Sequence, residues 1–312
     1  LDLHEALFHG PRPPGAAMVV DLVPPRKTPG KGASPSPAGF TLSSGQRPQE
    51  DADDEGMVHG SRSRGATREL RDIPVPAPGS GQVAVAVRAA GTNRGELIRG
   101  AQVRSGTPAA SPARAGTEFA GEIAALGEGV SGWKQGDRVM GRAVGSYAES
   151  VVVPQRALMR IPDGLSWAEA AAIPNVFVTA HDALVTNAAV TPGESVMVTA
   201  GPSGVGTAAI QIARYIGANP VLATTRSPAK AAALRALGAH EVVDTRAAGW
   251  VDAVLDATAG RGVDVIIDHV GGPMLADNIR TLALKGRLVS VGRNAGRVGD
   301  CDLDEVARKR AR

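Results

Sequence analysis

The sequence predicts an α/β protein with two domains: a first domain of antiparallel strands and a second domain built on a parallel, doubly wound sheet. Three observations support this fold class. Short apolar strands separated by glycines and charged turns follow one another through residues 82–154, strands alternate with helices after Pro192, and a glycine-rich turn opens that alternation. A chain of 312 residues, 43% of them hydrophobic, is long enough to bury two domain cores.

The composition argues against several classes of protein. The single cysteine, Cys301, can form neither an internal disulfide nor a thiolate-rich zinc site. The net charge is only +3 and the basic residues are dispersed apart from the terminal ARKRAR, so no nucleic-acid partner is expected. No apolar run approaches the roughly 20 residues of a membrane span, and a signal-peptide pattern is absent. We therefore expect a cytoplasmic protein without a membrane partner.

The first part of the chain changes character near Arg68. Proline, glycine and serine interrupt every pattern in residues 1–66, which predicts a mostly disordered or leader segment. Beyond it, the alternation of Val83, Val85 and Val87 predicts a half-buried strand, whereas MVHGSRSRGATREL is too polar and glycine-rich to be a good one. The first domain is expected over residues 67–177, and near its end Ser166 and Glu169 form the capping box of a helix.

The last part, residues 178–312, predicts a nucleotide-binding domain. Five apolar strands, beginning with ESVMVTAG and ending with RLVSVG, are separated by segments with helical spacing. Parallel strands need such crossovers, and runs without alternation, such as VDVII, suit strands that are buried on both faces.

The glycine-rich turn predicts a dinucleotide site, although its spacing is not the usual G-x-G-x-x-G. Gly201 and Gly204 leave room for a pyrophosphate to approach the backbone, and Gly206 lets helix and strand pack closely. The free N–H groups of the helix start attract the phosphate charge. Ser203 and Val205 complete this predicted cofactor-binding turn. The alternative is a tight turn without a ligand.

The end of the second strand bears on the cofactor. NAD-binding proteins usually place an acid there, about 20 residues beyond the glycine turn, to bind the ribose. This chain has TTRSPAK instead, where Arg226, Ser227 and Lys230 suit the 2′-phosphate of NADP(H). Alternatively, Ser227 caps the following helix and Lys230 is merely solvated.

Several stretches in order resemble the medium-chain dehydrogenase/reductase superfamily, specifically its zinc-free NADPH:quinone oxidoreductase branch. They are VAVRAAGTNRGEL, GTEFAGEIAALGEGVSGWKQGDRVMG, GSYAESVVVP, AAAIPNVFVTAHDAL, AGPSGVG and IIDHVGG. The resemblance covers roughly four fifths of the chain. It implies a GroES-like catalytic barrel joined to a Rossmann domain, with NADPH and substrate meeting between them.

The resemblance also bears on zinc and on the reaction. The alcohol dehydrogenases of the superfamily place a cysteine and a histidine in segments where this chain has Thr92-Asn93 and Thr117, so a catalytic zinc is not expected. The chemistry left is hydride transfer from NADPH to a quinone or an α,β-unsaturated carbonyl, with the proton coming either from solvent or from a protein group.

The catalytic candidates follow from the same resemblance. Asn93 matches an asparagine near nicotinamide and substrate, and Thr179 matches a threonine near nicotinamide. Alternatively, Asn93 only forms a turn after Gly91, and Thr179 is an ordinary hydroxyl on a helix, neither with a catalytic role. Tyr147 either donates a proton or packs in the pocket. The family's usual tyrosine a few residues after the asparagine has no match in NRGELIRG, and Arg99 is expected to contribute charge or a structural hydrogen bond there instead.

Three further residues complete the predicted cofactor site. Val270, Gly271 and Gly292 stand at strand carboxyl ends, where an open α/β sheet binds its ligand, and they are expected to contact nicotinamide through the backbone.

The resemblance finally predicts a C-terminal truncation, because the helix of residues 302–312 would precede a sixth strand. In the family that strand often lies at a dimer seam, so a homodimer is expected only if it is present, and its loss would expose the fifth strand. Alternative functions are an enoyl-thioester reductase, a non-catalytic NADP-binding protein and an unstable fragment.

Overall fold

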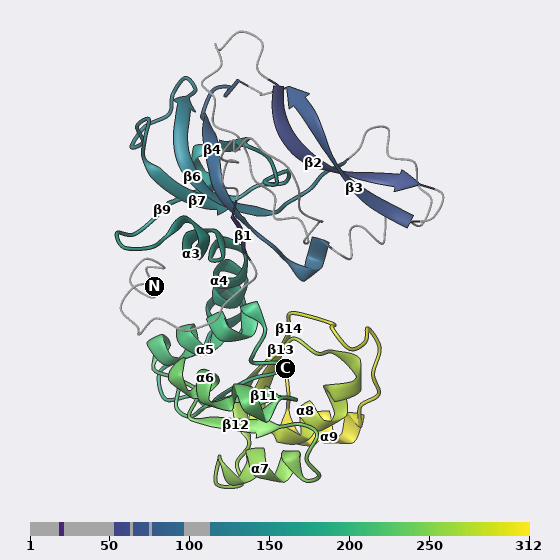
Figure 1. Ribbon diagram of the computed structural model, residues 1–312. Helices are drawn as coiled ribbons and strands as arrows, with labels where there is room; N and C mark the ends of the chain where they lie inside the picture. Colours follow the sequence, from purple (N-terminus) through teal and green to yellow (C-terminus); the bar gives the residue numbers. More distant parts are fainter. Residues whose placement is uncertain (1–18, 22–52, 63–64, 75–76, 97–112) are drawn as a thin grey trace. The chain divides into compact units, whose positions relative to one another are not determined.

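The computed structural model describes residues 19–21, 53–62, 65–74, 77–96 and 113–312 (Figure 1). They divide into two compact units, one ending at Asn175 and the other spanning Val176–Arg312. The domain boundaries and roles drawn from the sequence stay predictions. Within the described residues, no helix has the length and the hydropathy needed to cross a bilayer.

The unit that ends at Asn175 contains the antiparallel sheet that the sequence predicts. Its strand order is β1-β4-β6-β7-β9, and β8 also pairs with β4. The strands are β1 (Val19–Asp21), β4 (Gln82–Gly91), β6 (Glu118–Leu126), β7 (Arg138–Arg142), β8 (Ser150–Pro154) and β9 (Leu158–Arg160). Val83, Val85 and Val87 of β4 are buried against Phe119 and Ile123 of β6, as their alternation predicted.

A second, three-stranded sheet in this unit corrects the sequence analysis. It consists of β2 (Asp53–Arg62), β3 (Gly65–Pro74) and β5 (Ala113–Arg114), in the order β3-β2-β5. β2 and β3 pair in antiparallel register from Asp53↔Pro74 to Arg62↔Gly65, although much of this stretch was judged too polar and glycine-rich for a strand. Strand propensity depends on context, and backbone pairing needs no apolar alternation.

Two arginine–tryptophan contacts lie in the same unit. The guanidinium of Arg138 lies 4.4 Å from the ring centroid of Trp167, and that of Arg160 lies 4.4 Å from the ring centroid of Trp133. Trp167 begins helix α3 (Trp167–Ala171), whose capping box is present as predicted: the Ser166 hydroxyl accepts from the Glu169 N–H at 3.2 Å. The η1 turn (Gln155–Ala157) connects β8 to β9.

The unit Val176–Arg312 contains a parallel sheet with the strand order β12-β11-β10-β13-β14. These strands are β10 (Val196–Val198), β11 (Val221–Thr225), β12 (Glu241–Asp244), β13 (Val263–Asp268) and β14 (Leu282–Ser290). Every pairing is parallel, which confirms the predicted doubly wound sheet.

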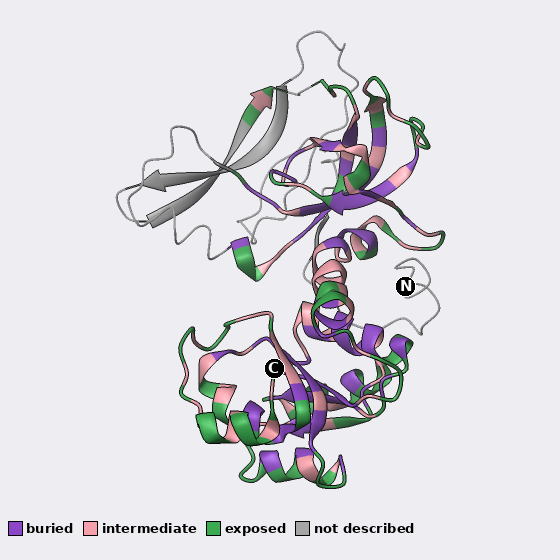
Figure 2. Cartoon of the chain, turned by 180° about the vertical axis from the view of Figure 1, so that it is seen from behind, coloured by how far each residue is buried: buried purple, intermediate pink, exposed green. Residues whose placement is uncertain are grey.

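Successive residues of the central strand show which helices cover which face. Val196 and Val198 belong to one core cluster with residues of α5 and α6, whereas Met197 belongs to another with residues of α7 and α8. Both faces of the sheet are therefore buried (Figure 2). The helical elements of this unit are α4 (Pro174–His181, which begins just before the unit), η2 (Asp182–Asn187), α5 (Gly204–Ile216), η3 (Pro228–Lys230), α6 (Ala231–Ala236), α7 (Trp250–Asp256), η4 (Gly272–Met274), α8 (Leu275–Thr281) and α9 (Leu303–Lys309).

The fifth strand begins earlier than the sequence indicated. The last of the segments with helical spacing, PMLADNIRTLALKG, precedes RLVSVG in the sequence, but in the structure α8 ends at Thr281 within this segment and β14 already starts at Leu282, which is fully buried and pairs with Val263. At the other edge of β14, the N–H of Arg312 donates to Gly286 O at 3.0 Å and its carbonyl accepts from the Leu288 N–H at 2.8 Å.

Candidate functional site

The glycine-rich turn connects β10 to α5 in the unit Val176–Arg312. Ala200 has a left-handed φ of 48° directly after the strand, a conformation that residues other than glycine seldom adopt. The Ser203 hydroxyl caps α5 by accepting from the Gly206 N–H at 3.1 Å. The Gly201 N–H donates to Thr224 O of β11 at 2.8 Å, which fixes the turn against the neighbouring strand.

The three glycines of the turn face protein atoms. A Cβ at Gly206 would lie 2.6 Å from Gly201 O, which agrees with the close helix–strand packing expected there. A Cβ at Gly201 would lie 3.0 Å from the Ala223 Cβ, and one at Gly204 would lie 3.1 Å from a Val176 methyl group. Packing therefore favours glycine or a small residue at these two positions, and the approach of a pyrophosphate stays a prediction.

The start of α5 nevertheless fits an anionic ligand. Within the described residues, the N–H groups of Gly204 and Val205 have no acceptor, and Gly204 is exposed. Two unbonded donors at the N-terminus of a 13-residue helix suit a phosphate oxygen.

The carboxyl end of β11 carries positive charge. Arg226 and Lys230 are exposed and have no acidic partner among the described residues. Ser227 is the N-cap residue of η3, but its side chain makes no capping hydrogen bond. The nearest acid in the sheet register, Asp244 at the end of β12, is engaged by Arg246 at 2.9 Å. The charged groups that are available to a ligand at this edge of the sheet are therefore positive.

The loops after β13 and β14 have little free hydrogen-bonding capacity. The N–H groups of Val270 and Gly271 both donate to the Asp268 carboxylate at 3.0 Å. At Gly292 a Cβ would lie 2.8 Å from His269 O, so the close approach of the two loops favours glycine. The N–H groups predicted to contact nicotinamide at Val270 and Gly271 are thus already used within the unit. Contacts through their carbonyl groups stay a prediction.

His269 holds an orphaned polar atom at the same edge of the sheet. Its side chain is buried, and Nδ1 lies 2.9 Å from Thr199 O. Because a carbonyl only accepts, the neutral ring carries its proton on Nδ1, and Nε2 is an acceptor without a partner among the described residues. Burial lowers the pKa of His269, which favours this neutral form. A buried acceptor beside the strand ends is compatible with a ligand that donates a hydrogen bond.

In the unit that ends at Asn175, Asn93 lies at the centre of a polar cluster. Its Nδ2 donates to Glu118 Oε1 at 2.6 Å and to Thr117 Oγ1 at 3.1 Å, and its Oδ1 accepts from Asn175 Nδ2 at 2.7 Å. The Asn175 N–H donates to Glu118 Oε2 at 2.7 Å. Asn93 is half-buried, whereas Glu118 is only 2% exposed. Asn93 is therefore part of a network rather than a simple turn residue.

Glu118 is the buried anion of this cluster. Burial raises its pKa, hydrogen bonds from Asn175 and Asn93 oppose that effect, and the pKa remains above the ordinary value. Gly91 makes room for this side chain, because a Cβ there would collide with Glu118 and lie 2.6 Å from Ala171 O.

A second buried carboxylate continues the network. Glu96 is 3% exposed, and its Oε1 accepts from Thr117 Oγ1 at 2.9 Å. The Tyr147 hydroxyl lies against Glu96 Oε2 and 3.3 Å from Gly91 O. Tyr147 is thus tied to a carboxylate rather than packed only among apolar groups.

The other predicted residues divide between the two units. Thr179 lies in α4 within Val176–Arg312, so its relation to Asn93 stays a prediction. Arg99 lies outside the described residues. Sequence reasoning missed Glu96, Glu118 and Asn175. For Glu118 a signal existed, since a carboxylate begins the apolar stretch EFAGEI, whose first four residues are all buried.

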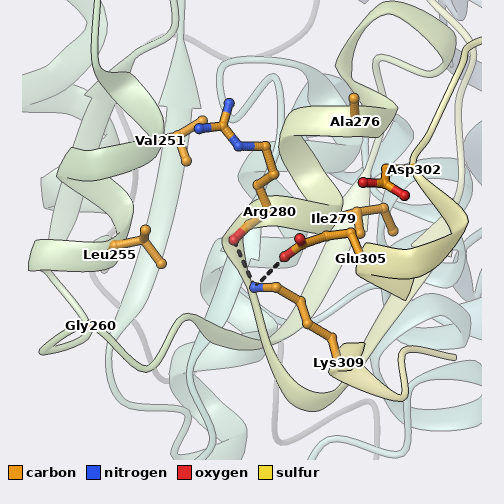
Figure 3. A pocket seen from close by; sticks show the side chains of 9 residues that line it. All are labelled: Val251, Leu255, Gly260, Ala276, Ile279, Arg280, Asp302, Glu305 and Lys309. Carbon is orange, nitrogen blue, oxygen red and sulfur yellow. Dashed lines mark hydrogen bonds and ion pairs between the residues drawn. The ribbon is translucent and has the colours of Figure 1, made fainter. Parts of the chain in front are cut away.

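A pocket of about 480 Å³ lies on the sheet face opposite α5, between α7, α8 and α9 (Figure 3). It is lined by Val251, Leu255, Gly260, Ala276, Ile279, Arg280, Asp302, Glu305 and Lys309. The Lys309 Nζ is engaged by Arg280 O at 2.8 Å and by Glu305 at 3.8 Å, and Arg280 pairs with Asp277 at 3.2 Å. The two cations that line the pocket are thus each paired with a neighbouring acid. The pocket is separate from the glycine-rich turn.

Comparison with known proteins places the chain in a family. Residues 79–163 match the alcohol dehydrogenase GroES-like domain and residues 204–312 match the zinc-binding dehydrogenase family. The quinone oxidoreductase of Rattus norvegicus is 36% identical over 226 residues, which are 71% of this chain and 67% of the rat protein. The solved structure of the CurK enoyl reductase has a TM-score of 0.72 at 28% identity, covering 83% of this chain and 78% of that one.

Polyketide synthases match as well. Erythronolide synthase EryA2 of Saccharopolyspora erythraea is 38% identical over 237 residues, which are 73% of this chain and 6% of that protein. The chain thus spans only a small part of the length of the synthases that it matches.

A dehydrogenase fold with a GroES-like part and a nucleotide-binding part defines the medium-chain dehydrogenase/reductase class, whose members bind a nicotinamide cofactor. Within that superfamily, the chain belongs to the quinone oxidoreductase-like branch.

Proposed function

We propose that this protein transfers a hydride from NADPH to a quinone or an α,β-unsaturated carbonyl without the help of zinc. The observation that supports a reaction without zinc is the hydrogen bond of 3.1 Å between Asn93 and Thr117. The alcohol dehydrogenases of the superfamily have a zinc-binding cysteine and histidine in these two segments, whereas the amide nitrogen and hydrogen-bonded hydroxyl of this chain are poor zinc ligands. In the described part of the chain, no three His, Cys, Asp or Glu side chains gather as a metal site requires.

The preference for NADPH over NADH rests on the end of β11. Arg226 and Lys230 are free to bind a 2′-phosphate, and the Ser227 hydroxyl is not used as a cap. A carboxylate for the ribose of NAD is missing from this strand end, and the neighbouring Asp244 is held by Arg246. Charge-assisted hydrogen bonds from arginine and lysine are among the strong phosphate contacts.

The residues have separate roles in the proposed reaction. The Gly204 and Val205 N–H groups bind the pyrophosphate, Arg226 and Lys230 bind the 2′-phosphate, and Asn93 and Thr179 orient the reacting groups. When bound, the reduced nicotinamide supplies the hydride. An acceptor that already withdraws electrons needs no metal to polarise it, and its proton comes from solvent.

The test is NADPH oxidation by the purified protein with a panel of quinones and enones, in parallel with saturated ketones. We expect turnover of the conjugated acceptors, little turnover of the saturated ketones, and no loss after treatment with a metal chelator. Binding of NADPH without oxidation of any acceptor would indicate a non-catalytic nucleotide-binding protein. Loss of activity with the chelator would contradict the zinc-free mechanism.

An enoyl-thioester reductase is the second candidate. The similarity to the CurK enoyl reductase and to polyketide synthases favours it, and the chemistry is the same hydride addition to a conjugated carbonyl. Comparing kcat/KM for a crotonyl thioester with kcat/KM for a simple quinone separates the two. A higher value for the thioester assigns the protein to this class.

A further inference from the structure

The amide of Asn93 has a fixed orientation. Glu118 Oε1 lies 2.6 Å from one amide atom of Asn93, and in its ionised form this carboxylate can only accept a hydrogen bond. The amide atom that faces this carboxylate is therefore Nδ2. The Asn175 side chain, which lies 2.7 Å from the other amide atom, acts as the donor to Oδ1.

This orientation uses the whole donor capacity of the amide. An asparagine has two N–H donors, and both are engaged, one by Glu118 and one by Thr117 at 3.1 Å. A carbonyl oxygen has two lone pairs, and within the described residues only the donor from Asn175 occupies Oδ1. Since Asn93 is half-buried rather than closed off, what it offers a ligand is an acceptor.

We propose that Glu118 and Asn175 are positioning residues that hold Asn93 as a hydrogen-bond acceptor. Asn93 then binds a ligand group that donates, a hydroxyl or an amide N–H of the kind that the nicotinamide riboside part of NADPH carries. It does not bind the carbonyl oxygen of the quinone or enone. The inference rests on the proposed function for the identity of the ligand, and it changes the role of Asn93 from contacting the acceptor to aligning the nucleotide.

The surroundings of Glu118 favour this arrangement. Its two oxygens each receive one N–H, from Asn93 and from the Asn175 backbone, so the ionised form is the one that these donors stabilise. The charged groups that face it are Glu96, which disfavours the ionised form, and Arg142, which favours it.

A reciprocal exchange of acid and amide tests the proposal. In Asn93→Asp two carboxylates face each other, and in Glu118→Gln a single amide replaces a carboxylate that accepted two N–H groups. In the double variant the amide introduced at position 118 can donate to the acid introduced at position 93, while Asn175 donates to the other oxygen of that acid. The double variant keeps the net charge and still presents an acceptor to the ligand.

The measurement is the Kd of NADPH by fluorescence titration, together with Tm, for the wild type and all three variants. We expect each single variant to raise the Kd about tenfold, the equivalent of one lost hydrogen bond to a charged group, and the double variant to return within about threefold of the wild type. The matched control is Glu122→Gln on the same strand, where Glu122 is partly exposed and pairs with Arg88, and it should leave the Kd unchanged.

Any other set of Kd values for these variants overturns the proposal. A double variant as weak as Asn93→Asp means that the ligand needs an N–H from position 93. A change in Tm with an unchanged Kd in all variants means that the network is only structural. The proposed function and the positioning role can be refuted independently. A wild-type protein that binds NADPH but reduces no acceptor refutes only the proposed function. A wild-type protein that turns over an acceptor, with a double variant whose Kd does not return toward the wild-type value, refutes only the positioning role.

Discussion

Arg226 and Lys230 place two positive charges beyond β11 that nothing in the described part of the chain neutralises. Replacing either by alanine removes one of the proposed contacts to a 2′-phosphate and breaks no side-chain hydrogen bond or ion pair among the described residues. We expect the Kd for NADPH to rise about tenfold in each variant, with the Kd for NADH and the Tm unchanged. Fluorescence titration with both nucleotides measures the difference.

Arg235→Ala is the control for this pair, since Arg235 is an exposed cation on the following helix that pairs with Glu241 at 3.3 Å. Equal weakening of NADPH and NADH binding by Arg226→Ala or Lys230→Ala would contradict the assignment of the 2′-phosphate site.

The candidate site illustrates what single residues reveal in sequence and what they do not. Asn93 was identifiable because it lies in a recognisable motif, and the cationic strand end because an expected acid was missing. The partners of Asn93 were not identifiable, since Glu118 and Asn175 are 25 and 82 positions away and meet it only through the fold. Local spacing carries no information about such contacts.

Within α5, the two glycines of the first turn differ in their surroundings. A Cβ at Gly206 would lie 2.6 Å from Gly201 O and 2.7 Å from Ala200 O, which are backbone atoms that cannot move aside alone. We expect Gly206→Ala to lower the free energy of unfolding by about 2–3 kcal/mol, as overpacking does.

Gly204→Ala is the matched change in the same turn. Its nearest neighbour would be a Val176 methyl group at 3.1 Å, and alanine favours helix over glycine by up to about 1 kcal/mol, so we expect a net change below about 1 kcal/mol. Urea unfolding of both variants measures the contrast. Similar decreases in the free energy of unfolding for the two variants would show that the close backbone contact at Gly206 does not determine the cost of adding a methyl group there.

Helices and strands were predictable where burial of their faces determines the pattern of apolar residues. The strands of the parallel sheet are buried on both faces, so their uninterrupted apolar runs identify them, and Ser166 and Glu169 marked the start of α3. The β2–β3 hairpin was missed because its pairing is made by the backbone. The end of α8 was misplaced because apolar residues at 282–284 suit a buried helix and a buried strand equally well.

At the scale of the whole molecule, residues far apart in sequence hold the parallel sheet together. Arg287 of β14 donates from Nη2 to Glu194 at 2.7 Å and from Nε to Ala188 O at 2.7 Å, which joins the fifth strand to the segment that precedes the first. Burial raises the pKa of Glu194, but hydrogen bonds from Arg287 and Thr191 outweigh burial and bring the pKa below its ordinary value.

This ion pair predicts a pH dependence. A carboxylate whose folded pKa is depressed stabilises the fold above its ordinary pKa, near 4.5 for glutamate, and the stabilisation is lost as the pH falls through the folded value. We expect Arg287→Met to lower the free energy of unfolding by about 1–2 kcal/mol at pH 7, and the difference from the wild type to shrink as the pH falls below 4.5.

Denaturant unfolding at a series of pH values tests the expectation, with Arg235→Met as a control at an exposed ion pair. A difference that stays constant down to acidic pH would mean that the hydrogen bond to Ala188 O, rather than the ion pair, accounts for the contribution of Arg287.

The three tryptophans give the two units different optical signals. The guanidinium groups of two arginines lie over Trp133 and Trp167 in the unit that ends at Asn175, whereas Trp250, the first residue of α7, is buried in the core of Val176–Arg312. Indole emission depends on polarity and nearby charge, so the two environments report separately on their own units. A Trp250→Phe protein leaves emission only from the other unit, and subtracting its unfolding curve from that of the wild type isolates the unfolding of the nucleotide-binding part.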